Sequence, residues 1–349
     1  MGLPLPPWAY AAGPPPVAGL LRHRPEDFVV DEVLGFEPDG EGEHVLVRLQ
    51  KRGANTDWAA RQLARLAGVR PAAVGYAGLK DRHAVTSQWF SVQLAGRGEP
   101  DWSALAGEGL EVLAAARHRR KLRRGALAGN RFELVLRQLS GETGELEGRL
   151  QTVVERGVPN YFGAQRFGRG GGNLERAEAL FAGRLHERNR TRRGLYLSAA
   201  RSFLFNQVLS RRVAEGSWDR ALTGEVLVLA GSRSFFLAET PDAETERRLA
   251  EGDIDPSGPL WGRGELPSRG AARELEEAVV EPFPLFREGL EAAGMDQERR
   301  PLRLRPEGLE GGLEDGGRSL RLRFTLPAGA YATTVLRELV ATDEAEAAD

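Results

Sequence analysis

Asp81 is the residue whose surroundings most suggest chemistry. It lies between two cations in the turn Gly78-Leu79-Lys80-Asp81-Arg82, and two predicted strands flank this turn, at 74–77 and 88–94. A Lys-Asp-Arg triplet in a turn is more often a solvated loop. A carboxylate beside positive charges, however, stays ionised at neutral pH, as a nucleophile or a general base must. Asp81 is therefore a candidate for either role.

Aromatic and amide side chains suggest a second kind of chemistry, the recognition of a nucleobase. Asn130 and Phe132 open a predicted strand directly after a basic segment. The common interpretation is a turn residue followed by a core residue. The alternative is a pair in which the amide binds a base edge and the ring stacks on the base. Phe28 and Tyr331 have the same two interpretations, core or stacking.

Clustered arginines indicate an anionic partner, although the formal net charge is only −2. Residues 117–124 read RHRRKLRR, with six Lys or Arg in eight positions, and residues 184–193 read RLHERNRTRR, with five Arg in ten. Such runs are commonly solvated faces, but phosphate affinity depends on clustering rather than on the total charge. Two clusters in one near-neutral chain therefore favour an anionic partner.

Lysine is scarce in this chain. Among the 48 basic residues only three are lysine, namely Lys51, Lys80 and Lys121. Lysine carries a slim point charge, whereas arginine carries a broad planar fork. The three lysines are therefore predicted to occupy places where arginine does not fit.

Several classes of protein are excluded or disfavoured. The chain has no cysteine, which removes disulfides and thiolate catalysis, and no two of its five histidines form a recognisable ligand pair. No apolar run is long enough for a membrane helix, and no signal peptide is recognisable. We expect a cytoplasmic protein without a membrane partner, and without a metal.

A glycine-rich stretch, Gly168 to Gly172, precedes a predicted helix and has two interpretations. It could cradle a phosphate on backbone N–H groups, or it could be a flexible connector. It is not a Walker A loop, because Gly-Lys-Ser/Thr is missing, and it lacks the βαβ context of a dinucleotide-binding fingerprint.

The elements that must position these residues predict an α+β protein with a largely antiparallel sheet. The first region mixes short strands and helices without regular βαβ alternation. The composition changes at Gly157, where aromatic residues and glycines become frequent. Strands are predicted at 27–33, 44–50, 74–77, 88–94, 131–137, 225–229, 234–237 and 320–326, and helices at 57–66, 145–156, 174–181, 198–213 and 331–340.

Six segments, in order and over nearly the whole chain, strongly resemble the TruD family of tRNA pseudouridine synthases. They are RPEDFVV at 24–30, KRGANT at 51–56, GLKDRHAVTSQ at 78–88, KLRRGALAGNRF at 121–132, VPNYFGAQRFG at 158–168 and LPAGAYATTVLREL at 326–339. All three lysines lie in these segments.

The resemblance implies an isomerase that converts a uridine of tRNA to pseudouridine, at position 13 of the D-arm in bacterial members, without a cofactor. Asp81 would be the catalytic carboxylate. Phe28, Asn130 and Tyr331 match positions that contact the target base, the last being commonly phenylalanine, and Arg22 matches a basic position near the catalytic Asp, commonly lysine. With Phe132 and Lys80 these residues form the predicted substrate-binding set.

The resemblance also implies a discontinuous catalytic domain. The predicted pseudouridine synthase domain, with its largely antiparallel mixed sheet, comprises residues 1–156 and 306–349, and an inserted α+β TRUD domain comprises residues 157–305. We expect a monomer. Two other classes stay open: a tRNA-binding protein without catalysis, and a carboxylate-dependent hydrolase, which would need a second acid about 5–10 Å from Asp81.

Overall fold

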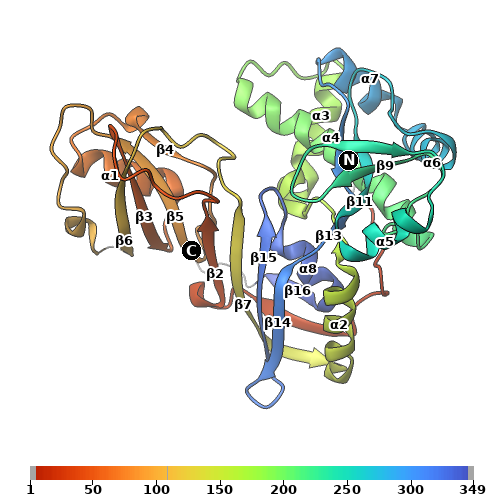
Figure 1. Ribbon diagram of the computed structural model, residues 1–349, viewed down its shortest axis with the longest axis horizontal. Helices are drawn as coiled ribbons and strands as arrows, with labels where there is room; N and C mark the ends of the chain where they lie inside the picture. The colour runs from red at the N-terminus through yellow and green to blue at the C-terminus, as the bar shows by residue number, and fades with distance from the viewer. Residues whose placement is uncertain (1–4, 108, 345–349) are drawn as a thin grey trace. The chain divides into compact units, whose positions relative to one another are not determined.

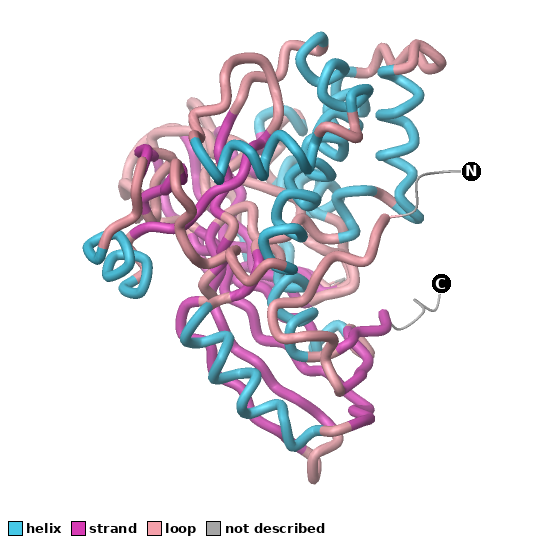
Figure 2. The backbone as a smooth tube through the Cα atoms, turned by 90° about the vertical axis from the view of Figure 1, so that its right-hand side faces the viewer, coloured by secondary structure: helices cyan, strands magenta, loops and turns pink. Residues whose placement is uncertain are grey.

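The structure is a computed structural model that describes residues 5–107 and 109–344 (Figures 1 and 2). The chain divides into two compact units. Unit 1 comprises the described parts of Met1–Pro15, Gln151–Arg305 and Ala330–Leu339, and unit 2 those of Pro16–Leu150, Pro306–Gly329 and Val340–Asp349. No helix of the described residues is both long and apolar enough to cross a membrane.

Unit 2 is built on one mixed sheet with the order β14-β15-β7-β2-β5-β3-β6 (Figure 1). Beside this row β4 pairs with β5, and β1 pairs with both β7 and β16. The pairs β2–β5 and β1–β16 are parallel and the others antiparallel, which confirms the predicted sheet type. The strands are β1 Val17–Leu21, β2 Phe28–Val33, β3 His44–Arg52, β4 Val74–Tyr76, β5 Val85–Gln93, β6 Leu110–His118, β7 Gly129–Gly141, β14 Glu307–Glu314, β15 Ser319–Pro327 and β16 Ala341–Glu344.

The core of unit 2 follows from the alternation of its strands. On β3, Val45, Val47 and Leu49 are fully buried and pack in one cluster with Leu63 of α1 (Thr56–Leu66) and Phe90 of β5. Each such side chain contributes roughly 1.5–3 kcal/mol of transfer free energy. This packing fixes α1 against β4 and β5, the two strands that flank Asp81.

The first and last parts of the chain share this sheet, as predicted. Strand β15 pairs with β7 over nine residues, with Phe324 opposite Phe132, and β16 pairs with β1, with Ala341 opposite Ala18. Helix α2 (Leu146–Arg156) then leads from unit 2 into unit 1.

Unit 1 is organised around the 25-residue helix α4 (Arg190–Ala214), which contacts α3 (Gly172–Phe181), α6 (Gly270–Val280) and α7 (Pro284–Ala292) (Figure 1). Its Phe203, Phe205 and Leu209 are buried in the core. A second sheet has the order β10-β9-β11-β12. The remaining elements are β8 Val158–Pro159, β9 Glu225–Leu229, β10 Phe235–Ala238, α5 Ala243–Glu251, β11 Ile254–Leu260, β12 Glu298–Pro301, β13 Arg303–Leu304 and α8 Ala332–Leu339.

The division into units differs from the predicted domain boundaries at two segments. The breaks near residues 150 and 305 are similar, but Met1–Pro15 and the closing helix α8 belong to unit 1 rather than to the unit with the large sheet. The side chains explain why: Thr334 Oγ1 of α8 donates to the carbonyl of Tyr161, and Arg337 donates to that of Trp8.

Candidate active site

The turn that carries Asp81 is anchored to the elements on both sides. The backbone N–H of Lys80 donates to Thr56 Oγ1 at 3.0 Å, and that hydroxyl donates to Gln88 Oε1 at 3.1 Å. The amide of Gln88 in turn donates to the carbonyl of Gly78. Because Thr56 opens α1 and Gln88 lies in β5, the turn is a fixed part of the sheet rather than a loose charged loop.

The carboxylate of Asp81 is held through both oxygens. Its Oδ2 lies 2.8 Å from Nη2 of Arg22, and its Oδ1 accepts a hydrogen bond from the backbone N–H of His83 at 3.1 Å. The Asp81 side chain is 27% exposed and that of Arg22 10%. The carboxylate is therefore positioned yet still open to a substrate.

Arg22 joins Asp81 to the aromatic ring of Phe28. The Arg22 guanidinium carbon lies 4.2 Å from the centroid of that ring, within the range of a cation–π contact. Arg22 follows β1 with φ at 60°, a left-handed conformation that is costly for a residue with a side chain. Such backbone strain commonly occurs at functional sites. The cation that pairs with Asp81 thus comes from another element, not from its sequence neighbours Lys80 and Arg82.

Lys80 organises a second, buried part of the site. Its ammonium lies 2.9 Å from Glu32 Oε2 and donates to Asn130 Oδ1 at 2.6 Å. The side chains of Lys80 and Glu32 are 8% and 0% exposed. Because Lys80 occupies the oxygen of the Asn130 amide, that amide presents its NH2 group as a donor.

Lys51 binds the backbone of the turn that carries Asp81. Its fully buried ammonium donates to the carbonyls of Asp81, at 2.8 Å, and Ala54, at 2.7 Å. Burial lowers the pKa of Lys51 to about 8, against the opposing effect of the Asp81 charge. A compact ammonium fits between two carbonyls where a planar guanidinium would be too broad, as the scarcity of lysine indicated.

Phe132 and Tyr331 have different surroundings. Phe132 is 7% exposed, packed edge-to-face on Phe28 and stacked at 5.4 Å on Phe324, so it lies in the aromatic core of unit 2. Tyr331 is half-buried in unit 1, where its hydroxyl accepts from Nη2 of Arg166 at 2.7 Å. The structure brings the predicted residues into a network of two contact sets, Arg22 with Asp81 and Phe28, and Lys80 with Asn130. The adjacent positions of Lys80 and Asp81 in the turn join the two sets. Base contact by Phe132 and by Tyr331 stays a prediction.

The glycine-rich stretch forms a tight entry into α3. Gly168, Gly170 and Gly171 have φ values of 76°, 60° and 81°. The phosphate-cradle interpretation stays a prediction. Among residues 5–107 and 109–344, no group of three or more His, Asp or Glu side chains is arranged to hold a metal ion.

A comparison with known protein families shows which family this chain belongs to. Residues 8–176 and 172–339 match the family described as tRNA pseudouridine synthase D (TruD). The chain belongs to the TruD family. As a member of this family it is an isomerase.

Individual TruD relatives are similar over almost the whole chain. A tRNA pseudouridine synthase D of Nitrosococcus oceani is 55% identical over 97% of this chain and 94% of its own length. That of Methylococcus capsulatus is 54% identical over 93% and 92% of the two chains. In a crystal structure, a Methanosarcina mazei protein assigned as tRNA pseudouridine synthase D has the same fold, with a TM-score of 0.72, 24% identity and 95% coverage of both chains.

Two residues of the candidate site were not predicted as site residues. Glu32 lies on the same face of β2 as Phe28 and Val30, the buried face, where an unpaired carboxylate would be costly. Its position in the alternating pattern could have revealed a buried ion pair. The scarcity of lysine drew attention to Lys51, but nothing in the sequence predicted its contact with the backbone of Asp81.

Proposed function

We propose that this chain converts the uridine at position 13 of tRNA, in the D-arm, to pseudouridine, with Asp81 as the catalytic carboxylate and no cofactor. The observation that carries the proposal is the arrangement of Asp81, Arg22 and Phe28, in which one guanidinium binds the carboxylate and covers the ring. Relatives that are 55% and 54% identical carry the name tRNA pseudouridine synthase D.

Recognition of the target uridine begins with its removal from the RNA stack, because the glycosidic bond is otherwise out of reach. The amide of Asn130, oriented by Lys80, donates a hydrogen bond to a uracil carbonyl. The Phe28 ring is 5% exposed and lies under Arg22, so uracil reaches its face only when the guanidinium shifts. In this proposal, entry of the base loosens the ion pair and frees Oδ2 of Asp81.

Asp81 then acts at the ribose by one of two routes. Its carboxylate attacks C1′ and forms a covalent bond, or it removes the proton from C2′. In both routes the bond between C1′ and N1 breaks, uracil rotates, and a new bond joins C1′ to C5. On the first route C5 displaces the Asp81 carboxylate from C1′, and on the second the proton held by Asp81 returns to C2′. The C5 proton is lost and N1 gains a proton, so atoms and electrons balance without a redox partner.

The hydrolase alternative requires a second carboxylic acid that faces the substrate. Glu32, the other carboxylate of this network, has no exposed side-chain surface and is bound to Lys80. It is therefore a poor candidate for that acid, and the site favours isomerisation.

The decisive test is Asp81→Asn, compared with Asp31→Asn as a matched control. Asp31 lies in the same sheet and pairs with Arg48 at 3.6 Å, so the control makes the same chemical change in another ion pair. Single-turnover tritium release from tRNA labelled at uracil C5 should fall by roughly three or more powers of ten for Asp81→Asn and change less than about threefold for the control.

Filter binding of the same variants separates catalysis from recognition. The Asp81→Asn variant should bind tRNA as tightly as the parent or slightly better, because one negative charge is gone. If the protein only binds tRNA, the unsubstituted parent would release no tritium either. Primer extension after carbodiimide treatment maps the modified position, and pseudouridine at any site other than 13 would contradict that part of the proposal.

A further inference from the structure

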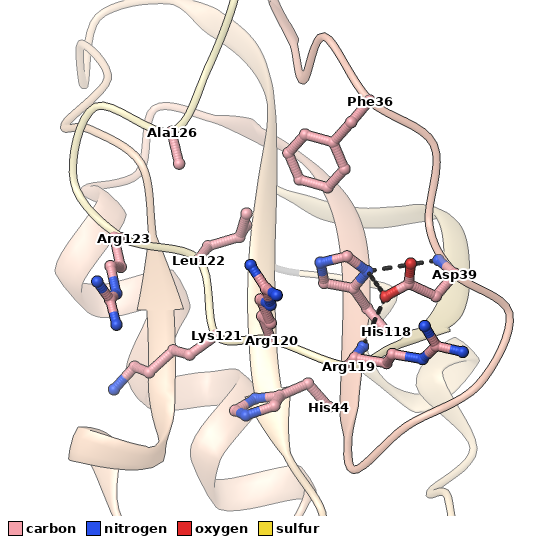
Figure 3. Close-up of a pocket in the computed structure, with 10 residues that line it drawn as sticks. All are labelled: Phe36, Asp39, His44, His118, Arg119, Arg120, Lys121, Leu122, Arg123 and Ala126. Atoms are coloured by element: carbon pink, nitrogen blue, oxygen red, sulfur yellow. Dashed lines mark hydrogen bonds and ion pairs between the residues drawn. The ribbon is translucent and has the colours of Figure 1, made fainter.

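A cavity of about 710 Å³ lies in unit 2, at the start of β3 (Figure 3). His44, the first residue of β3, is opposite His118, the last residue of β6, and both line the cavity. Lys51, which contacts the Asp81 carbonyl, lies seven residues along the same strand. At about 3.3 Å per residue, roughly 23 Å of strand separate the two places. None of the residues that line the cavity is among those that contact Asp81, so the cavity is distinct from the site of Asp81.

The cations of the basic segment 117–124 differ in how their charge is balanced. Arg117 pairs with Glu99 at 3.2 Å and Arg119 pairs with Glu41. For Arg120 and Arg123, which also line the cavity, no carboxylate within the described residues lies at ion-pair distance. These two guanidiniums line the cavity without an ion-pair partner among the described residues, and Arg120 acts on the carboxylate of Asp39 only at longer range. A guanidinium group suits a phosphate.

An aromatic ring faces the same hollow. Phe36 is 39% exposed and stacks on His118 with 5.3 Å between the ring centroids. The imidazole of His118 is itself held by the carboxylate of Asp39, 2.8 Å from Nδ1, and the Arg119 backbone N–H donates to that carboxylate. His118, held by Asp39, therefore fixes the position of the Phe36 ring. Figure 3 shows Phe36, Leu122, Arg120 and Arg123 around one hollow.

We propose that this cavity binds one nucleotide of the tRNA other than the reacting uridine. The base stacks on Phe36, and the phosphate lies between Arg120 and Arg123. A stacking ring beside two guanidiniums without carboxylate partners matches the two parts of a nucleotide. The inference rests on the proposed function for the identity of the RNA. It assigns this subsite a role in affinity, because none of its lining residues contacts Asp81.

The test uses full-length protein and unmodified tRNA, with filter binding from about 50 to 200 mM salt. Phe36→Ala should weaken binding about 5- to 100-fold at fixed salt without changing the salt slope, whereas Phe36→Tyr should bind like the parent. The double variant Arg120→Ala/Arg123→Ala should lower the log–log slope by about 1, as expected for one lost phosphate contact. The single-turnover rate at saturating tRNA should stay within about threefold of the parent for all three.

The matched control is Arg233→Ala/Arg247→Ala, which removes two exposed arginines of unit 1 and the same charge. The subsite is overturned if Phe36→Ala binds like the parent, or if the Arg120 and Arg123 double variant has the slope of this control. A fall in the saturated rate with unchanged affinity also overturns it. Failure of the proposed function is a separate result, because the parent would then form no pseudouridine whatever the cavity variants do.

Discussion

Lys80 donates a hydrogen bond to Oδ1 of Asn130 at 2.6 Å while its ammonium also lies 2.9 Å from Glu32. A buried cation between a carboxylate and an amide fixes which end of that amide points outward. The NH2 group of Asn130 is thereby committed as a donor, and uracil offers carbonyl acceptors to match it. Lys80 is thus a positioning residue for Asn130.

Replacement of Asn130 by Asp should remove this donor while Lys80 still finds an acceptor. We expect turnover to fall by roughly 100- to 1,000-fold, as when one donor to a developing charge is lost, since the new carboxylate also repels a uracil carbonyl. Single-turnover tritium release measures the effect. Gln62→Glu on α1, where the side-chain oxygen still accepts from Arg65, is the control for an amide-to-acid change in the same unit. Equal rates for both variants would contradict base recognition by Asn130.

Both the positive charge and the planar shape of the Arg22 guanidinium should be needed for full activity. Arg22→Lys keeps the charge near Asp81 but loses the planar fork over Phe28, and we expect a rate about 3- to 10-fold below the parent. Arg22→Ala leaves Asp81 without its ion pair and should cost about 100-fold, comparable to a misplaced catalytic group. Arg24→Ala, an exposed arginine two residues along, is the control. Full activity of Arg22→Ala would show that the ion pair has no part in catalysis.

The low pKa of Lys51 predicts a pH-dependent stability. The pKa is about 8 in the folded protein and about 10.4 in the unfolded chain, so between these values the unfolded chain binds more protons. Stability therefore rises with pH across this window, by at most about 1.4 kcal/mol per pH unit, and is lost as the pH falls through 8. Urea unfolding from about pH 7 to 10 should show this rise in the parent and not in Lys51→Met. The prediction is wrong if the free energy of unfolding changes with pH in the same way in the parent and in Lys51→Met.

The arginines at the start of α4 should favour RNA binding at the expense of stability. Asn189 caps this helix, and Arg190, Arg192 and Arg193 place cations at its N-terminal end, where the helix dipole disfavours them. Arg190→Ala/Arg193→Ala should stabilise the protein by about 0.3–1 kcal/mol per residue. It should also flatten the salt dependence of tRNA binding.

Arg211→Ala is the control at the other end of α4, where Arg211 pairs with Glu215 and agrees with the dipole. It should lower the free energy of unfolding slightly and leave the salt slope unchanged. A slope for Arg190→Ala/Arg193→Ala equal to that of the parent would remove this end of α4 from the RNA interface.

Strands and helices with clear periodicity were predictable from the sequence. The strands predicted at 44–50 and 131–137 lie within β3 and β7, and the helix predicted at 57–66 lies within α1. Strands β11 (IDPSGPL) and β14 (EGLEGGLE) were not predicted, because proline, glycine and exposed acids mask strand character. Helix α4 begins at Arg190, eight residues before the predicted start at Ser198. The earlier start was missed because residues 190–194 (RTRRG) contain no apolar side chain.

The candidate site was only partly contained in local sequence. The turn around Asp81 indicated a reactive carboxylate, but it suggested Lys80 and Arg82 as the neutralising cations. In the structure Arg22, nearly sixty residues earlier, has this role, and Lys80 turns to Glu32. Contacts between distant elements depend on the register of the sheet, which no local pattern specifies.

The pairing of Ala18 with Ala341 makes completion of the large sheet wait for a strand that is made more than 300 residues later. At about 5–20 residues per second, β1 leaves the ribosome roughly 15 to 65 seconds before its partner β16 is made. During that interval β1 lacks one of its two neighbours, and β7 also waits for β15. A nascent chain therefore cannot complete the sheet that carries Asp81, so prematurely terminated chains would be released with open strand edges that proteases and chaperones recognise.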